Sequence, residues 1–166
     1  AFTIAMVLQD MNEQGLEFRY SILGTDVSTE VLAEAQAAIY RRDFVAAVPA
    51  PMLQRYMMQS RDSRSDLVRI IPELRSLVQF AHLNLMDPSY PFDRDVDLIF
   101  CRNVLIYFDQ KTQNAVVRRL MSHLRPGGFL ILGHSESMAG AGIEGLDQVK
   151  PTIYQNIQKA AEKVAA

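Results

Sequence analysis

Residues 97–103 have the sequence DLIFCRN, in which apolar side chains follow one another between polar ends. A nearly continuous apolar run of this length is typical of a strand that is buried on both faces in a parallel sheet. We therefore predict a strand at residues 97–101, with Arg102 and Asn103 at the point where it stops. Ligands of open α/β sheets bind beyond the carboxyl ends of the strands, so these two residues are candidates for a binding site.

Helix and strand patterns alternate on both sides of this stretch. Apolar spacing predicts a helix at residues 2–14, closed by Gly15. It predicts another that begins after Asp109, with an apolar face made of Val116, Val117, Leu120, Met121 and Leu124. Strands are expected at residues 18–24, 78–85, 129–133 and 153–157, a turn at residues 125–128, and a helix that starts at the N-cap Ser28 and includes Leu32, Ala35 and Ile39. This alternation predicts an α/β fold with a mostly parallel sheet and helices on both faces.

The stretch at about residues 49–78 interrupts the alternation and is interpreted as an insertion. It contains three prolines, and its pattern predicts a short helix at residues 52–58, a polar turn at 61–65 and a short strand at 67–71. Between residues 50 and 80 there are five arginines against three acidic residues. This basic excess can attract an acidic partner, although a solvated charged face explains it equally well.

Asp26 follows the strand expected at residues 18–24, as Asn84 closes the later one at 78–85. In a nucleotide-binding βαβ unit, an acidic residue at the end of the second strand binds the ribose hydroxyls, about 20 residues beyond a glycine-rich loop. That spacing predicts the glycine loop at or just before residue 1, so we expect the first strand of the sheet to be missing. Alternatively, Asp26 caps the next helix together with Ser28, and spacing alone does not separate the two interpretations.

Composition limits the class of protein. The 166 residues fit one globular domain, with 49% hydrophobic and 22% charged residues, and no apolar run is long enough to span a bilayer. The net charge of −2 does not predict a nucleic-acid binder, and the single Cys101 forms no internal disulfide. His82, His123 and His134 lack the spacing of metal ligands, so no metal site is predicted. We expect a cytoplasmic protein.

Several blocks of sequence occur together in an order known from one family. These blocks are residues 97–108 (DLIFCRNVLIYF), 125–128 (RPGG), 133–137 (GHSES), 23–32 (LGTDVSTEVL), 38–40 (AIY) and 84–85 (NL). With these blocks the chain resembles the CheR-type chemotaxis protein methyltransferases from about residue 3 to residue 157. The resemblance implies a Rossmann-like sheet that binds S-adenosylmethionine, and an inserted antiparallel β-subdomain at residues 49–78.

The resemblance also implies an activity. Members of this family transfer a methyl group from S-adenosylmethionine to glutamate side chains in the cytoplasmic region of chemotaxis receptors, which yields a methyl ester and S-adenosylhomocysteine. Some members bind a peptide at the receptor's C-terminus by adding it as a strand to the β-subdomain. Residues 1–157 would form the methyltransferase domain and residues 158–166 a tail. The family's N-terminal domain, first strand and glycine-rich loop match no part of the chain, which argues against turnover by this chain alone.

The resemblance implies site roles for six residues of this chain. The resemblance implies that Asp26 binds the ribose, that Asn84 and Leu85 contact the adenosine, and that Arg102 and Asn103 border the cofactor. It also places the Tyr107 ring and hydroxyl near the sulfonium and the methyl group. The alternatives are ordinary ones, because Tyr107 can be a half-buried aromatic residue, Asn103 a turn residue and Arg102 a surface ion-pair partner.

Two other functions are considered. The block at residues 133–137 faintly resembles the nucleophile elbow of a serine hydrolase, but the final glycine is missing and no histidine follows Ser135. The second is a non-catalytic module of the same fold that binds a cofactor or a peptide. Retention of Arg102, Asn103 and Tyr107 argues against such a module.

Overall fold

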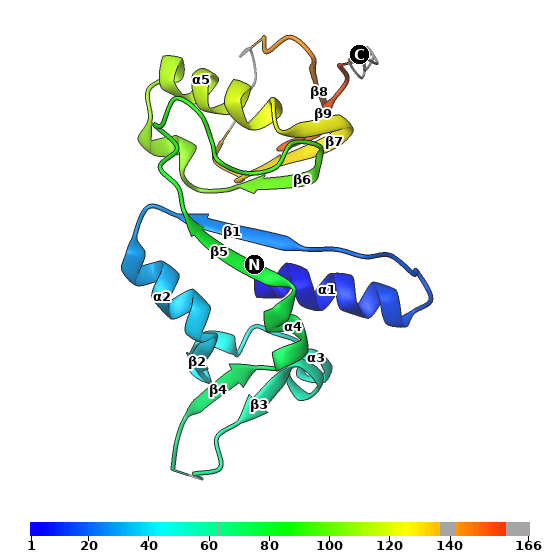
Figure 1. The fold of residues 1–166 in the computed structure, drawn as a ribbon, viewed down its shortest axis with the longest axis vertical. Coiled ribbons are helices and arrows are strands. Elements are labelled where there is room, and N and C mark those ends of the chain that lie inside the picture. The colour runs from blue at the N-terminus through cyan, green and yellow to red at the C-terminus, as the bar shows by residue number, and fades with distance from the viewer. Residues whose placement is uncertain (63, 137–141, 159–166) are drawn as a thin grey trace. The chain divides into compact units, whose positions relative to one another are not determined.

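The computed structural model describes residues 1–62, 64–136 and 142–158, and the chain divides into two compact units (Figure 1). Unit 1 spans Ala1–Asn84 and contains α1 (Phe2–Glu13), β1 (Ile22–Asp26), α2 (Thr29–Ala37), β2 (Ile39–Arg41), η1 (Asp43–Val45), α3 (Ala50–Tyr56), β3 (Met57–Gln59), β4 (Leu67–Ile70), α4 (Pro72–Ser76) and β5 (Val78–His82). The described part of unit 2 contains β6 (Val96–Cys101), η2 (Leu105–Tyr107), α5 (Gln110–Met121), β7 (Leu124–Leu132), β8 (Leu146–Lys150) and β9 (Ile153–Asn156). Of the tail expected at residues 158–166, only Gln158 lies among the described residues.

Helix α1 confirms the first predicted helix. Its buried side chains Phe2, Ala5 and Met6 recur at helical spacing and face the core of unit 1. The other fully or nearly buried members of that core come from the later segments of the unit: Ala38, Tyr56, Ile70, Leu74 and Val78. The helix is therefore fixed to unit 1 by apolar packing.

Strands β1 and β5 pair in parallel, with Ile22 opposite Val78 and Asp26 opposite His82. The strand predicted at residues 18–24 lies slightly later in the chain, because β1 begins at Ile22 and ends at Asp26. The shift has a local cause, since the backbone N–H and C=O of Phe18 bond the side-chain amide of Asn12 and not a neighbouring strand. Asp26 thus lies at the carboxyl end of a parallel strand.

Helix α2 begins as predicted, because Ser28 Oγ accepts a hydrogen bond from Val31 N–H at 3.3 Å. It ends earlier than predicted. Ala38 adopts the left-handed conformation with φ 54°, and Ile39 starts strand β2, so the assignment of Ile39 to the helix was wrong. Ala38 is fully buried, and its N–H still bonds the carbonyls of the last turn. A left-handed residue at a helix C-terminus is usually glycine, and here burial of the small alanine side chain stabilises that conformation.

A small antiparallel sheet in unit 1 has the strand order β2-β4-β3, which confirms an antiparallel subdomain (Figure 1). It takes its first strand from Ile39–Arg41, before the stretch at residues 49–78. The helix predicted at residues 52–58 lies at Ala50–Tyr56, and Met57 and Met58 instead pair with β4. Strands β2 and β3 are the two outer strands of this sheet.

The sheet of unit 2 has the order β6-β7-β9-β8, with β6 and β7 parallel and the other neighbours antiparallel. The parallel strand predicted at residues 97–101 is confirmed, but its burial on both faces is not. Within this sheet β6 is an edge strand, and Leu98 and Phe100 are 39% and 43% exposed. Strand β8 was not predicted, because its side chains are mostly exposed and show no apolar alternation.

The turn predicted at residues 125–128 lies inside strand β7. Val96 pairs with Leu124 and Leu98 with Phe129, so residues 125–128 form a bulge against β6. A Cβ atom on Gly128 would lie 3.1 Å from the carbonyl oxygens of both Val96 and Asp97. The backbone of the bulge approaches β6 so closely that a side chain at this position would be crowded.

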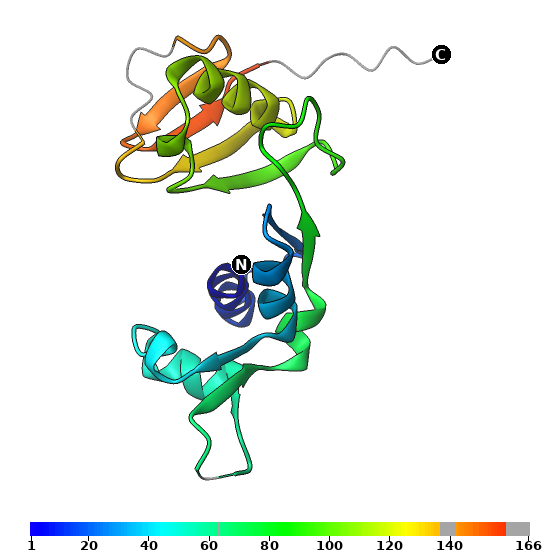
Figure 2. The same cartoon turned by 90° about the vertical axis from the view of Figure 1, so that its left-hand side faces the viewer.

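Helix α5 covers one face of this sheet (Figure 2). Asp109 caps it, since its Oδ1 accepts a hydrogen bond of 2.8 Å from Thr112 N–H. The buried side chains of the helix are those that the spacing predicted: Val116, Val117, Leu120 and Met121. The assignment of Leu124 to this helix was wrong, because Leu124 is the first residue of β7. Among the residues described, each helix is too short or too polar to cross a membrane.

Candidate functional site

The chain turns sharply where strand β6 ends. Arg102 and Asn103 follow Cys101, the last residue of the strand, as the sequence predicted. Asn103 has φ 60°, in the left-handed region that asparagine tolerates better than most residues. The chain then enters the short helix η2, which contains Leu105 and Tyr107. We call residues 102–107 the β6 loop.

The β6 loop has one buried anchor and an exposed polar and aromatic surface. Leu105 is 1% exposed, whereas Tyr107 is 79% exposed and Arg102 is also exposed. Within the described part of the chain, the side chains of Arg102 and Tyr107 have no hydrogen-bond or ion-pair partner. A guanidinium can bind an anion with charge-assisted hydrogen bonds, and an aromatic face attracts a cation. The loop therefore presents groups for both signs of charge.

A single buried carboxylate holds the backbone of this loop. Glu136 is 5% exposed, and its Oε1 accepts hydrogen bonds from Val104 N–H at 2.8 Å and Leu105 N–H at 2.7 Å. Its Oε2 accepts from Asn103 N–H at 2.9 Å and from Gly133 N–H at 2.5 Å. We call this arrangement the Glu136 clasp. It joins the end of β6 to the end of the neighbouring strand β7.

Gly133 leaves room for the clasp. A Cβ atom at this position would lie 2.6 Å from Glu136 Oε2 and 3.0 Å from Asn103 N, and closer still to Asn103 Oδ1. Heavy atoms that are not bonded to each other do not approach so closely, so a side chain here would displace either the carboxylate or the β6 loop. The spacing of Gly133 and Glu136 serves the geometry of this one site.

The carboxyl of Glu136 stays ionised in spite of its burial. Burial acts to raise its pKa, but the hydrogen bonds from the backbone N–H groups of Asn103, Gly133, Leu105 and Val104 outweigh that effect, and the pKa lies below its ordinary value. The pKa of the neighbouring Cys101 thiol lies above its ordinary value, at about 12. Burial is the larger cause, and the negative charge of Glu136 is the smaller one. At neutral pH the carboxylate of the clasp is therefore ionised, whereas the Cys101 thiol is neutral.

Helix α5 holds the other side of the β6 loop. The side-chain Nε2 of Gln113 donates to the carbonyl oxygens of Leu105 at 3.0 Å and Phe108 at 2.9 Å. Glu136 therefore binds N–H groups of the loop while Gln113 binds carbonyl groups at its far end. Backbone groups of the loop are thus satisfied from both sides, which favours this conformation.

The remaining candidates lie at the end of the parallel pair in unit 1. Asp26 closes β1, its carbonyl accepts a hydrogen bond of 3.0 Å from Leu83 N–H, and Asn84 follows directly. Asp26 Oδ1 accepts a hydrogen bond of 2.8 Å from Ser28 N–H. In the described residues of unit 1, Oδ2 has no such partner. The carboxylate can thus cap the turn before α2 and still present one oxygen to a ligand.

Five of the six predicted residues fall into two sets. Asp26 and Asn84 lie together at the carboxyl ends of β1 and β5 in unit 1. Arg102, Asn103 and Tyr107 lie in the β6 loop of unit 2. Leu85 opens unit 2, and its carbonyl accepts a hydrogen bond of 2.9 Å from the hydroxyl of Tyr90. Each set lies at the carboxyl end of a parallel strand, where α/β proteins bind their ligands.

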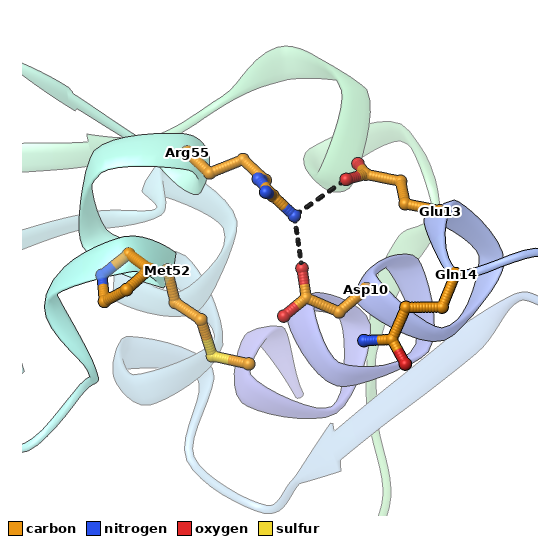
Figure 3. Close-up of a pocket in the computed structure, with 6 residues that line it drawn as sticks. Asp10, Glu13, Gln14, Met52 and Arg55 are labelled. Atoms are coloured by element: carbon orange, nitrogen blue, oxygen red, sulfur yellow. Dashed lines mark hydrogen bonds and ion pairs between the residues drawn. The ribbon is translucent and has the colours of Figure 1, made fainter.

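A cleft of about 350 Å³ lies elsewhere in unit 1, between α1 and α3 (Figure 3). Its lining residues are Asp10, Glu13, Gln14, Pro51, Met52 and Arg55. Arg55 Nη1 lies 2.8 Å from Asp10 Oδ1 and 2.7 Å from Glu13 Oε2, so the charged groups of the cleft pair with one another (Figure 3). None of the six predicted site residues lines it. We interpret these contacts as ion pairs that hold α1 and α3 together.

Sequence reasoning missed the role of Glu136. The block at residues 133–137 was noted for its resemblance to a family motif and for a faint likeness to a nucleophile elbow, and Glu136 was given no role. A signal was present in the spacing of Gly133 and Glu136 after a buried strand. The partners at residues 103–105 lie more than 30 positions earlier, however, and no local pattern connects them.

Comparison with known proteins gives consistent results. A chemotaxis protein methyltransferase of Borreliella burgdorferi is 39% identical over 155 residues, which cover 93% of this chain and 53% of that protein. The chemotaxis protein methyltransferase of Escherichia coli is 41% identical over 138 residues, which cover 83% of this chain and 48% of that protein. The chain thus spans about half the length of the curated relatives that it matches.

The family model described as "CheR methyltransferase, SAM binding domain" matches residues 1–154, which include both sets of predicted site residues and the Glu136 clasp. The matched segment also contains the antiparallel sheet β2-β4-β3. The chain therefore belongs to the CheR methyltransferase family and corresponds to its SAM-binding domain.

Proposed function

We propose that this chain binds S-adenosylmethionine and belongs to an enzyme that methylates glutamate side chains of chemotaxis receptors in the cytoplasm. The observation that carries the proposal is the match of residues 1–154 to the SAM-binding domain of the CheR family. The geometry of the β6 loop supports it, because an exposed aromatic ring and an exposed guanidinium follow a parallel strand, where ligands of such sheets bind. The names of the curated relatives support a receptor-modifying role in chemotaxis.

Each candidate residue has a proposed role that its chemistry suits. The second carboxylate oxygen of Asp26 accepts hydrogen bonds from the ribose hydroxyls, and Asn84 and Leu85 contact the adenosine. Arg102 and Asn103 border the cofactor, where the Arg102 guanidinium can form charge-assisted hydrogen bonds. The exposed ring of Tyr107 attracts the sulfonium, because the face of an aromatic ring is electron-rich.

The proposed reaction needs no general base. A glutamate side chain is already ionised near neutral pH, so one of its oxygens can attack the methyl carbon directly. The new C–O bond forms as the methyl–sulfur bond breaks, and the electron pair of that bond stays on sulfur. The products are a neutral methyl ester and S-adenosylhomocysteine, and no proton moves. The work of the protein is to align carboxylate, methyl and sulfur, which can contribute about 7–11 kcal/mol.

Binding and transfer assays test the proposal. S-adenosylhomocysteine binding is measured by calorimetry with the chain and with a form extended to the length of its relatives. Transfer of labelled methyl groups to receptor fragments is then followed with the extended form. We expect binding and labelling by that form. Absence of binding would refute the methyltransferase function, and binding without labelling would favour the alternative, a non-catalytic module of the same fold.

We further propose that the antiparallel sheet binds an acidic peptide, such as a receptor C-terminus, along strand β3. Three features support this site. Strand β3 is an outer strand, its side chain Met58 is 40% exposed, and the exposed residues Arg61 and Arg64 follow it. Backbone pairing along an open edge supplies affinity, and the arginines would favour a negatively charged peptide.

Amide NMR titration with a receptor C-terminal peptide tests this second proposal. We expect the amide resonances of residues 57–59 to shift, while those of the opposite outer strand, residues 39–41, stay in place. A variant with Arg61→Gln and Arg64→Gln should bind the peptide more weakly, with the difference reduced by salt. Shifts confined to residues 39–41, or no shifts at all, would exclude strand β3 and leave the proposal for methyl transfer intact.

A further inference from the structure

We propose that Glu136 is a positioning residue for methyl transfer, which holds the β6 loop in the conformation that orients Arg102, Asn103 and Tyr107. The proposal rests on the proposed function for the reaction and on the Glu136 clasp for the mechanism. Glu136 itself is buried and faces backbone groups, so its effect on the reaction would be indirect. It acts through the loop that carries the candidate residues.

The first argument is the number of backbone donors that converge on one side chain. Asn103, Val104, Leu105 and Gly133 each donate an N–H group to the Glu136 carboxylate, at 2.5–2.9 Å. Three of these donors are consecutive residues of the β6 loop. Consecutive N–H groups can point at one acceptor only if the chain turns tightly around it, and Asn103 makes that turn with its positive φ. The carboxylate and the loop conformation therefore require each other.

The second argument is the position of these donors relative to the candidate residues. Asn103 is itself a donor, Arg102 precedes it, and Tyr107 lies two positions beyond the donor Leu105. The buried side chain of Leu105 and the carbonyl contacts of Gln113 keep η2 in place from the other side. A change in the clasp would rotate the backbone that carries the Tyr107 ring. A misplacement of about 1 Å in a reacting group can cost on the order of 10²-fold in rate.

The third argument concerns the chemistry of the acceptor. Each oxygen of the carboxylate accepts two hydrogen bonds, Oε1 from Val104 and Leu105, and Oε2 from Asn103 and Gly133. Glutamine has the same shape but carries an NH₂ group in place of one oxygen, which would face two N–H donors. Aspartate keeps both oxygens but is one methylene shorter. The two substitutions therefore separate the effect of the charge, which glutamine removes, from the effect of the side-chain length, which aspartate changes.

The test compares Glu136→Gln, Glu136→Asp and a control, Glu144→Gln, in the form extended to the length of the relatives. Glu144 is an exposed acidic residue of the same unit, outside the clasp. For each variant, kcat and the KM values for S-adenosylmethionine and receptor are measured well below the melting temperature. Amide hydrogen exchange is recorded at residues 103–105 and 133, and circular dichroism gives the folded fraction.

We expect Glu136→Gln to lower kcat by about 10- to 100-fold while the protein remains folded, with faster exchange at the four clasp amides. Glu136→Asp should fall between this variant and the wild type, because it keeps the charge. The control should match the wild type. A fall in kcat that only tracks the unfolded fraction, or a change of less than about twofold with unchanged exchange, would overturn the proposal.

A second measurement requires no substitution and separates the two proposals. In the wild-type protein, acid titration followed by NMR should shift the amide resonances of residues 103, 104, 105 and 133 together, at the pH where the Glu136 carboxyl takes up a proton. Independent shifts at these amides would overturn the clasp. If the extended wild-type form binds no S-adenosylhomocysteine, the proposed function fails and the role in transfer fails with it. Coupled amide shifts would then still show that Glu136 holds the loop.

Discussion

The carboxylate of Asp10 in α1 accepts a hydrogen bond of 2.6 Å from the hydroxyl of Tyr56, the last residue of α3. Tyr56 is 1% exposed and belongs to the core of unit 1, so the bond links a buried ring to a partly exposed acid. Strand β3 begins at the next residue, Met57. This pair therefore fixes the start of strand β3 against α1.

Replacement of Tyr56 by phenylalanine should lower the free energy of unfolding by about 1.5–3 kcal/mol, the usual contribution of a hydrogen bond to a charged group. The apolar packing of the ring is kept, so the loss reports the bond to Asp10. Urea denaturation followed by circular dichroism measures the change. Tyr40→Phe serves as the control, because among the described residues the half-buried Tyr40 hydroxyl has no hydrogen-bond partner. Equal losses in both variants would contradict the assigned role of Asp10.

The same tyrosine predicts how stability depends on alkaline pH. Burial, and after it the hydrogen bond to Asp10, raises the pKa of Tyr56 to about 12. An unfolded tyrosine has a pKa of about 10, so the native state holds the proton more tightly. The stabilisation is complete below pH of about 10 and is lost as the pH rises to about 12. Between these values the wild type should lose more unfolding free energy than Tyr56→Phe. Parallel loss in the two proteins would exclude Tyr56 as the titrating group.

Asp26→Asn should separate the two interpretations of Asp26. Asparagine keeps Oδ1 as an acceptor for Ser28 N–H, so we expect unfolding free energy to change by less than about 0.5 kcal/mol. Loss of the charge should weaken S-adenosylhomocysteine binding by about 10- to 100-fold, which corresponds to one charge-assisted hydrogen bond. Calorimetry measures both quantities. Ser28→Ala should do the reverse, with a loss of about 1 kcal/mol in stability from the missing cap and no change in affinity. Unchanged affinity in Asp26→Asn would exclude the role in ribose binding, so that capping would be the only remaining role of Asp26.

Tyr107 should act through its ring. Because its side chain is 79% exposed, neither Tyr107→Phe nor Tyr107→Ala should change the melting temperature. We expect Tyr107→Ala to lower kcat/KM for S-adenosylmethionine by about 10- to 30-fold, since a desolvated cation–π contact contributes up to about 2 kcal/mol. Tyr107→Phe keeps the aromatic face and should lose less than about threefold. A phenylalanine variant as impaired as the alanine variant would assign the effect to the hydroxyl.

Much of the fold follows from local patterns. The helical spacing of Phe2, Ala5 and Met6 marked α1. The N-cap Ser28 marked the start of α2, and the helical pattern that follows Asp109 marked the start of α5. In each case a short stretch contains the whole signal. The candidate residues at the end of β6 were predictable for the same reason, because the strand and its last residue are adjacent in the sequence.

Other features depend on contacts between distant segments. Alanine at position 38 gives no sign that α2 ends there, since its left-handed conformation is held by burial in the core of unit 1. The glycines at 127 and 128 were expected to form a turn, but pairing of β7 with both β6 and β9 draws them into a bulged strand. Asn156 Nδ2 supports that bulge by donating to the carbonyls of Leu124 and Arg125, 32 and 31 residues away. Tertiary packing overrides the local turn preference at these positions.

The Glu136 clasp also bears on how this domain can be recombined. The donors at residues 103–105 and the acceptor at 136 come from segments about 30 residues apart, yet they form one hydrogen-bonded network. An exchange of the β6 loop between relatives would preserve that network only if residues 133–136 were exchanged with it. The two segments are therefore expected to behave as a single module in chimeric proteins and to change together during divergence.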